Sequence, residues 1–206
     1  MCAIVGSFDK DKLIELIKLN SYRGSHSFSV TMLDSVRLRV VEKSFGEVDT
    51  GAISIGPGQY CIVHIQAPTT SAKDHSNIHP AQEEYTCLWH NGIIKAEHVK
   101  KMQAVYGSDT DWDTELLLRA VNTSTDTLND IDGSFSCLWY NGASAFLFRN
   151  DISPMFVDDD LNISSTKFVG SKSTPANTIL GMDIENRKLY NKASFKTVYN
   201  PYYFGD

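Results

Sequence analysis

A cysteine directly follows the initiator methionine, and this position gives it a chemistry that the other three cysteines lack. If Met1 is removed, Cys2 becomes the first residue and carries a free α-amino group beside its thiol. The pKa of an α-amino group is about 7.7 to 8, so this group can take the thiol proton near neutral pH. The thiolate that results is a strong nucleophile. The position equally suits a small buried residue at the start of a strand, and position alone favours that structural interpretation.

The pattern Cys-Leu-Trp-x-Asn-Gly occurs twice, at residues 87–92 and 137–142. A strand-like apolar run, residues 143–148, follows the second copy, so its Asn-Gly predicts a β-hairpin with a type I′ turn. Apolar residues at helical spacing, residues 93–105, follow the first copy. We therefore expect Asn91-Gly92 at a strand-to-helix junction, where free backbone N–H groups can face a ligand. An ordinary turn explains the dipeptide alone equally well.

The first six residues, Met-Cys-Ala-Ile-Val-Gly, resemble the start of class II glutamine amidotransferases, which are N-terminal nucleophile hydrolases. The resemblance continues in chain order over about residues 1 to 170. Each match is weak alone, but their common order makes chance agreement improbable. The further segments that carry it are residues 22–27 (Tyr-Arg-Gly-Ser-His-Ser), 64–69 (His-Ile-Gln-Ala-Pro-Thr), 78–80 (Ile-His-Pro), 90–94 (His-Asn-Gly-Ile-Ile), 113–115 (Asp-Thr-Glu), 132–135 (Asp-Gly-Ser-Phe) and 149–155 (Arg-Asn-Asp-Ile-Ser-Pro-Met).

The resemblance implies a role for each matching residue. Cys2 would attack a side-chain amide, while the Asn91 side chain and the Gly92 N–H would hold the oxyanion that forms. Loss of one such donor typically costs about 2.7 to 4 kcal/mol of barrier. Asp113 would take the substrate ammonium, although an aspartate before Thr-Glu also suits a helix N-cap. The expected substrate-binding residues are Gln66, Thr69, Asp113 and Arg23.

The sequence departs from the family pattern at the position expected to bind the substrate carboxylate. Gln66 stands where the family has arginine, so a bidentate, charge-assisted clamp is replaced by one neutral hydrogen bond of about half the strength. Three explanations stay open: weak glutamine binding, another cation such as Arg23 or Lys73, or a substrate without that carboxylate. Ala3 replaces glycine and His26 replaces aspartate. Ala3 is compatible with the pattern if its φ angle is negative.

Three histidines invite a metal-site interpretation, which their spacing does not support. His64, His79 and His90 fit no standard zinc pattern, and no Cys-x-x-Cys pair accompanies them. In the family that the chain resembles, the counterparts of these residues are not metal ligands. We therefore expect no metal ion and no cofactor.

The elements that must position these residues follow from hydrophobic periodicity and turn residues. We predict a strand over residues 1–8, a helix from Asp9 to about Asn20, and a second helix over residues 113–121. Further strands are expected at residues 29–32, 36–41, 52–55, 60–65, 156–157, 162–164 and 188–190. The resemblance implies an α+β fold of the N-terminal nucleophile hydrolase type, a four-layer αββα sandwich of two antiparallel sheets. No linker divides the chain, so one domain is expected over residues 1–206.

Composition excludes several classes of protein. Hydrophobic residues make up 42% and charged residues 21% of the 206, which excludes a wholly disordered chain. The net charge of −6 argues against binding to the phosphate backbone of nucleic acids. No apolar run approaches the length of a membrane span and no signal peptide is evident, so we expect a cytoplasmic protein away from membranes. The other three cysteines, Cys61, Cys87 and Cys137, are expected to be core thiols.

The expected function is hydrolysis of the glutamine side-chain amide by Cys2, through a thioester, with release of ammonia. The amidotransferase motifs occupy most of the chain, so a separate synthetase is the expected ammonia acceptor. Two alternatives remain open. One is a catalytically silent binding or regulatory subunit of the same fold, and the other is an amidohydrolase that acts on a different amide.

Overall fold

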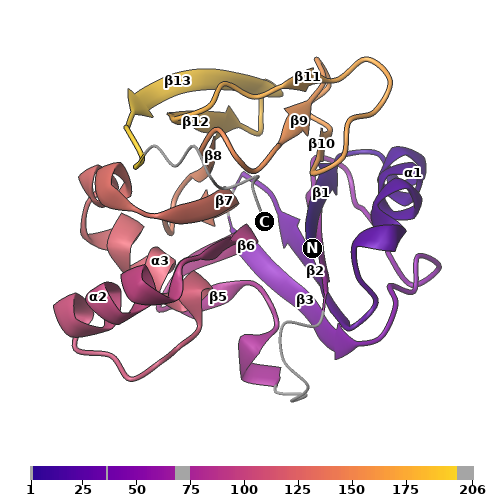
Figure 1. Ribbon diagram of the computed structural model, residues 1–206. Coiled ribbons are helices and arrows are strands. Elements are labelled where there is room, and N and C mark those ends of the chain that lie inside the picture. Colours follow the sequence, from indigo (N-terminus) through magenta and orange to yellow (C-terminus); the bar gives the residue numbers. More distant parts are fainter. Residues whose placement is uncertain (1, 36, 68–74, 199–206) are drawn as a thin grey trace.

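The computed structural model describes residues 2–35, 37–67 and 75–198, which form two stacked antiparallel sheets covered by helices on both outer sides (Figure 1). The predicted αββα sandwich is confirmed. One sheet has seven strands in the order β11-β9-β10-β1-β4-β2-β3, and the other has six in the order β13-β12-β8-β7-β6-β5.

The bounds of the elements are as follows. The first sheet contains β1 (Ala3–Ser7), β2 (Ser27–Leu33), β3 (Leu38–Phe45), β4 (Tyr60–Gln66), β9 (Phe156–Val157), β10 (Ile163–Ser164) and β11 (Lys172–Ser173). The second contains β5 (Ala81–Glu83), β6 (Thr86–Ile94), β7 (Gly133–Tyr140), β8 (Ala145–Arg149), β12 (Thr178–Asp183) and β13 (Lys188–Ser194). The helices are α1 (Lys10–Asn20), α2 (Ala96–Tyr106) and α3 (Asp113–Thr123), with short 3-10 turns at Ser21–Arg23, His75–Asn77 and Thr125–Asp130. No described helix has both the length and the apolar character of a membrane span.

Three hydrophobic clusters correspond to the three contacts between the four layers. Helix α1 packs Leu13, Leu16 and Ile17 on the outer face of the first sheet. Ile4, Tyr60 and Ile62 of that sheet meet Trp89, Leu138 and Leu147 of the second sheet between the layers. Helices α2 and α3 cover the outer face of the second sheet through a cluster that includes Met102, Leu117, Phe135 and Phe148. Alternation along each strand therefore supplies two buried faces per sheet.

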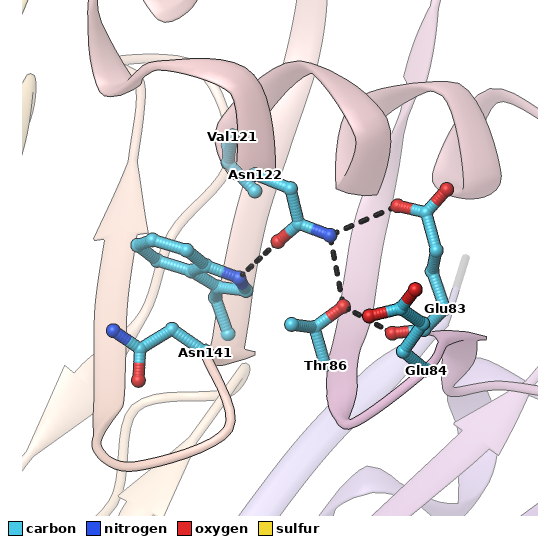
Figure 2. Close-up of a pocket in the computed structure, with 7 residues that line it drawn as sticks. Glu83, Glu84, Thr86, Val121, Asn122 and Asn141 are labelled. Atoms are coloured by element: carbon cyan, nitrogen blue, oxygen red, sulfur yellow. Dashed lines mark hydrogen bonds between the residues drawn. The ribbon is translucent and has the colours of Figure 1, made fainter.

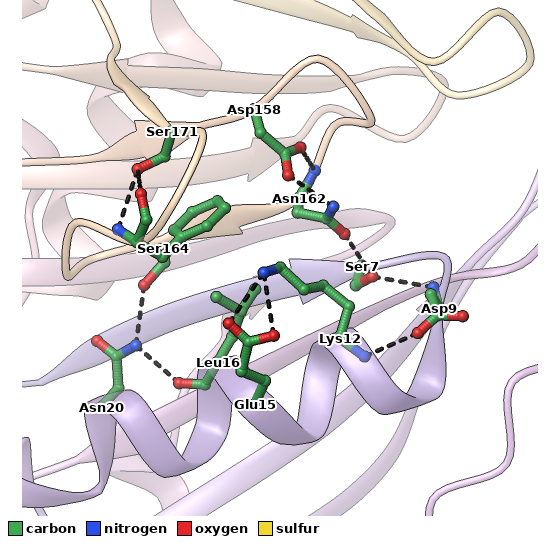
Figure 3. Close-up of polar contacts among 11 residues, drawn as sticks. Ser7, Asp9, Lys12, Glu15, Leu16, Asn20, Asp158, Asn162, Ser164 and Ser171 are labelled. Carbon is green, nitrogen blue, oxygen red and sulfur yellow. Dashed lines mark hydrogen bonds and ion pairs between the residues drawn. The ribbon is translucent and has the colours of Figure 1, made fainter.

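A buried asparagine ties the end of α1 to the segment beside β1. Asn20 is fully buried, and its side-chain NH2 donates to the Leu16 carbonyl and to Ser164 Oγ, both at 2.8 Å (Figure 3). Its side-chain oxygen accepts from Thr166 Oγ1 at 2.8 Å. Ser165, which lies between these two partners in the sequence, accepts a hydrogen bond from the Ile4 N–H through its Oγ at 2.9 Å. One polar side chain thus fixes the helix against the segment that holds the first strand.

Several predicted elements need correction. The region 52–55 is a turn followed by irregular chain rather than a strand; its Ile53 is buried by packing on the α1 side of the first sheet, without a strand partner. Residues 141–144 form a four-residue connection between β7 and β8, in which Asn141 Oδ1 accepts from two backbone N–H groups, so the hairpin is confirmed but its two-residue type I′ turn is wrong. Strands β5, β11 and β12 were not predicted. The first residue of the predicted strand at 36–41 lies outside the described residues.

We predict that replacing Asn20 by alanine lowers the free energy of unfolding by about 2–3 kcal/mol, because buried partners of its side chain lose their hydrogen bonds. Urea denaturation followed by far-UV circular dichroism measures the change. The control is Asn186→Ala, whose side-chain NH2 bonds an exposed carboxylate and whose loss should leave the midpoint unchanged. Equal midpoints for Asn20→Ala and the wild type would contradict this role of Asn20.

Candidate active site

Cys2 lies immediately before β1, inside the molecule, with 8% of its surface exposed. The φ angle of Ala3 is not positive, so the condition for an alanine in place of the family glycine is met. Burial raises the pKa of the Cys2 thiol, the Ala67 backbone N–H and the Arg23 charge lower it, and the Asp113 charge raises it. The net effect is a raised pKa, so the thiol needs a base to become a nucleophile.

The register between β1 and β4 sets the surroundings of Cys2. Ala3 pairs with Ile65, which brings Cys2 to the end of β4, where Gln66 is the last residue of the strand and Ala67 follows it. The backbone of Gly24 lies close to this end of β4: a Cβ atom added to Gly24 would be only 2.5 Å from the Ala67 nitrogen. That close approach places Arg23 beside β4. Arg23 donates from Nε to Thr166 Oγ1 at 2.9 Å and from Nη2 to the Ser165 carbonyl at 3.2 Å, so the segment that holds β1 also holds this guanidinium.

Asn91 and Gly92 lie within strand β6, and the predicted strand-to-helix junction is therefore wrong in its position. Strand β6 continues to Ile94, and α2 begins at Ala96. Ile93 was counted on the buried face of the predicted helix, but it is 63% exposed in the strand. Apolar residues between charged ones fit both periods over so short a stretch, and pairing with β7 decides in favour of the strand.

The conformation at Gly92 explains why glycine is needed there. Its φ is +153°, and a Cβ atom would lie 2.0 Å from the Ser134 carbonyl oxygen and 2.8 Å from His90 Nε2. The preceding Asn91 is 4% exposed, and its side chain forms no hydrogen bond with the residues that the structure describes. A side-chain amide that has little exposed surface and no such partner is suited to donate to a developing oxyanion.

Asp113 is the first residue of α3, and the alternative that it caps this helix is wrong. Trp112 holds the N-cap position without a side-chain hydrogen bond, and Asp113 Oδ2 instead accepts from the Ile94 N–H at 3.0 Å. Its Oδ1 lies 3.7 Å from His90 Nδ1 and 3.3 Å from Thr114 Oγ1. Burial raises the pKa of this carboxyl, but the His90 charge and the hydrogen bonds outweigh it and leave the pKa below its ordinary value. Asp113 is therefore a carboxylate at neutral pH.

The three histidines form a buried group around these residues. His64 and His79 stack with ring centroids 4.0 Å apart, and His64 Nε2 lies 3.1 Å from the His90 carbonyl oxygen. Burial lowers the pKa of His64 to about 3 and that of His79 well below its ordinary range, so both rings are neutral. Among the described residues, no three potential ligand side chains are arranged around a common metal position.

The structure brings most of the predicted site residues to one end of the two sheets. Cys2, Arg23 and Gln66 come from the first sheet and its connections, and Asn91, Gly92 and Asp113 come from the second sheet and α3. The charges of Arg23 and Asp113 both act on the Cys2 thiol, which places the two groups around it. Thr69 and Lys73 lie outside the described residues.

His79 and Thr114 connect Gln66 to Asp113, a role that the motifs in the sequence do not indicate. His79 Nδ1 lies 3.0 Å from Gln66 Oε1, and its Nε2 lies 3.0 Å from Thr114 Oγ1. Both residues stand in segments that carry the family resemblance, so their positions were noted, but nothing in the sequence indicates that they touch.

A surface depression of about 500 Å³ lies elsewhere, at the other end of α3 (Figure 2). Asn122 organises it: its side-chain NH2 donates to Glu83 and Thr86, and its oxygen accepts from Trp139 Nε1 at 3.2 Å. Asn122 is nine residues beyond Asp113, about 14 Å along the helix. The depression is therefore separate from the residues around Cys2.

Comparisons with known proteins agree with the geometry. No protein-family model matches the chain. Glutamine–fructose-6-phosphate aminotransferase from Photorhabdus laumondii is 31% identical over 136 residues, which is 59% of this chain and 22% of the relative. The enzyme of the same name from Bradyrhizobium diazoefficiens is 28% identical over 183 residues, 81% of this chain and 29% of the relative. The chain thus spans less than a third of the length of these curated relatives.

Solved structures confirm the fold. Glutamine phosphoribosylpyrophosphate amidotransferase from B. subtilis superposes with a TM-score of 0.70 at 17% identity, covering 93% of this chain and 49% of that one. A glutamine aminotransferase class-II domain protein from Silicibacter pomeroyi gives a TM-score of 0.53 at 12% identity, covering 93% of this chain and 99% of that one. The sequence relatives and these neighbours together confirm the predicted resemblance to class II glutamine amidotransferases.

The two Asn-Gly pairs provide a matched test of the backbone at Gly92. We predict that Gly92→Ala lowers the free energy of unfolding by at least about 3 kcal/mol, since it adds backbone strain to a clash with a carbonyl oxygen. Gly142→Ala should cost only about 1–2 kcal/mol, because its φ is +92° but its nearest contact would be 3.5 Å away. Chemical denaturation of both variants measures the difference, and equal losses would show that the Gly92 backbone is not constrained as described.

Acid should destabilise the protein through its buried neutral histidines. The pKa of His64 is about 3 in the folded chain against an ordinary value of 6.5, so between these values the unfolded chain binds more protons. Stability is therefore complete above pH 6.5 and falls as the pH drops toward 3, by about 1.4 kcal/mol per pH unit for each such histidine. Urea denaturation at half-unit pH steps measures the slope. His64→Leu removes one titrating group and should reduce that slope, whereas an unchanged slope would contradict the assignment.

Proposed function

We propose that this chain, a class II glutamine amidotransferase domain by fold and by sequence relationship, hydrolyses the side-chain amide of glutamine at Cys2. The observation that carries the proposal is that the charges of a carboxylate, Asp113, and a guanidinium, Arg23, both act on one buried thiol. The Asn91 side chain, which has no hydrogen bond to the described residues, follows His90, whose carbonyl oxygen lies 3.1 Å from His64 Nε2 of β4. Asp113 would pair with the ammonium of glutamine, Arg23 with its carboxylate, and Asn91 with the oxyanion formed from its amide.

The raised pKa of Cys2 makes a local base necessary, and the α-amino group exposed by removal of Met1 would supply it. The sulfur then bonds to the amide carbon, and the negative charge on the oxygen is held by the Asn91 side chain and the Gly92 N–H. Collapse of this intermediate breaks the C–N bond, and ammonia leaves with the proton taken from the thiol. Water then attacks the thioester, which releases glutamate and restores the thiol.

Substrate binding follows from the charges that remain available. Arg23 uses two of its five N–H groups on Thr166 and Ser165, so others are left for a carboxylate. Gln66 uses one N–H of its amide on the Asn77 carbonyl and keeps the second for the substrate. This arrangement supports the explanation in which Arg23 compensates for the missing family arginine.

The fate of the ammonia belongs to the same proposal. The relatives named above are aminotransferases that are more than three times as long as the region they share with this chain. We propose that the ammonia passes to a synthetase on a separate polypeptide, and a cytoplasmic location would suit that transfer.

The test uses the full chain after mass spectrometry has established its N-terminal residue. We expect the form without Met1 to release glutamate from glutamine and to gain covalent mass on Cys2 from a glutamine-analogue electrophile. Asn91→Ala should lower kcat about 10²-fold to 10³-fold. The matched control is Asn141→Ala, which changes the same pattern on the hairpin and should leave the rate unchanged. If the Met1-free protein released no glutamate and formed no adduct, the proposal would be overturned and a binding subunit would be favoured.

A further inference from the structure

The orientation of the Gln66 side-chain amide is fixed by the Asn77 carbonyl oxygen, which can accept a hydrogen bond but cannot donate one. Gln66 Nε2 lies 3.1 Å from the Asn77 carbonyl oxygen, and Gln66 Oε1 lies 3.0 Å from His79 Nδ1. If the amide were turned round, its oxygen would face the Asn77 carbonyl oxygen with no proton between them. Gln66 Oε1 therefore accepts, and His79 Nδ1 carries the proton that it accepts.

The proton on Nδ1 determines the next hydrogen bond in the chain. The His79 ring is neutral because burial lowers its pKa, so its Nε2 has a lone pair and no proton. Thr114 Oγ1 lies 3.0 Å from this nitrogen and must donate to it. A hydroxyl has one proton, so Thr114 cannot also donate to Asp113 Oδ1, which is 3.3 Å away.

Asp113 consequently keeps part of its carboxylate for a ligand. Its Oδ2 accepts from the Ile94 N–H at 3.0 Å, while its Oδ1 faces His90 Nδ1 at 3.7 Å, beyond hydrogen-bond range. His90 Nε2 faces the Ser134 carbonyl oxygen at 3.3 Å and therefore carries a proton, while its Nδ1 lies 3.3 Å from Thr114 Oγ1. His79 Nε2, at 3.0 Å, is the closer acceptor for the Thr114 proton. Among the residues that the structure describes, Oδ1 thus has no donor within hydrogen-bond range while the chain runs in this direction.

We propose that Gln66 is a positioning residue: its side-chain oxygen sets the direction of a buried hydrogen-bond chain through His79 and Thr114, which keeps the Thr114 proton away from Asp113 and leaves Asp113 Oδ1 for a substrate ammonium. The last step rests on the proposed function, whereas the direction of the chain does not. A residue without an acceptor at position 66 would reverse the chain. The ring would then place its proton on Nε2, where Thr114 Oγ1 can accept it, and the Thr114 proton would turn to Asp113.

The direction is tested by nuclear magnetic resonance of the full chain with ¹⁵N-labelled histidine, which identifies the protonated ring nitrogen. We expect the wild type to hold His79 with its proton on Nδ1. Gln66→Met has similar volume and no acceptor, so it should move the proton to Nε2, whereas Gln66→Glu keeps an acceptor and should not. A wild-type ring protonated on Nε2, or no change in Gln66→Met, would overturn the proposal.

The effect on Asp113 is tested by coupling to Thr114. In Gln66→Met the Thr114 proton becomes a donor to the carboxylate, so a ¹³C titration should show a lower Asp113 pKa, and the KM for glutamine should rise roughly twofold to tenfold with little change in kcat. Both shifts should persist when Thr114→Ser is added, because serine keeps the hydroxyl. The Asp113 shift should vanish when Thr114→Val is added.

These variants distinguish a failure of the positioning role from a failure of the proposed function. Gln66→Met also removes the amide N–H that faces the substrate, so a part of the KM increase that survives Thr114→Val measures that direct contact. An Asp113 pKa shift that survives Thr114→Val, or a KM increase that Thr114→Val does not reduce at all, would overturn the positioning role, because neither could come from the Thr114 proton. If no variant hydrolyses glutamine, the proposed function fails, while the ring tautomer and the Asp113 titration still decide the direction of the chain.

Discussion

The pairing of β1 between β4 and β10 is the constraint on which the site depends. Ala3 pairs with Ile65 on one side, and Val5 pairs with Ser164 on the other, so the strand is held along both edges. Because side chains alternate, a shift of one residue in either pairing would turn Ile4 out of the core between the sheets and move Cys2 with it. The buried contacts of Asn20 and Ser165 oppose such a shift, and the same segment fixes Arg23. Cys2, the proposed nucleophile, is therefore positioned by an ordinary strand, and its φ is not positive.

The second sheet and α3 position Asn91, Gly92 and Asp113, and the backbone at Gly92 is what brings these residues together. Gly92 allows β6 to pass so close to Ser134 that a Cβ atom would not fit. The N–H of Ile94, two residues later, bonds Asp113, which fixes the start of α3 against the strand. The inner faces of the sheets are polar near this end: buried atoms of Ser29, Thr31, His64, Trp89 and Ser136 have no hydrogen-bond partner within the described chain. A buried polar group without a hydrogen bond lowers the free energy of unfolding. Departures of this kind from a well-satisfied core are expected near functional sites.

Sequence patterns could predict the parts of this structure that local rules determine. Helix α1, which was expected from Asp9 to about Asn20, the buried first strand and helix α3 follow from residue type and period alone. Strand β12 was missed because Gly181 interrupts its apolar run, and only the fold brings the Tyr190 ring of β13 over that glycine. The extent of β6 was misjudged for a similar reason, since its pairing with β7 is a contact between distant segments. The six described site residues were named from ordered motifs, but their hydrogen bonds depend on geometry that spacing does not contain.

Gln66 is best understood together with the neutral groups around it. His64 and His79 lie in a region where burial already disfavours charge, and the Lys43 charge lowers the pKa of both rings further. An arginine at position 66 would add a second cation there, next to rings that cannot offer a negative charge, and it could not accept from His79 Nδ1. A glutamine meets the same neighbours without a charge, and its oxygen and nitrogen satisfy one donor and one acceptor. The site then carries its charges at the ends, on Arg23 and Asp113, with a neutral chain between Gln66 and Thr114. The proposed substrate, with an ammonium and a carboxylate, would match that distribution, because both of its charges would have partners while its amide faced Cys2.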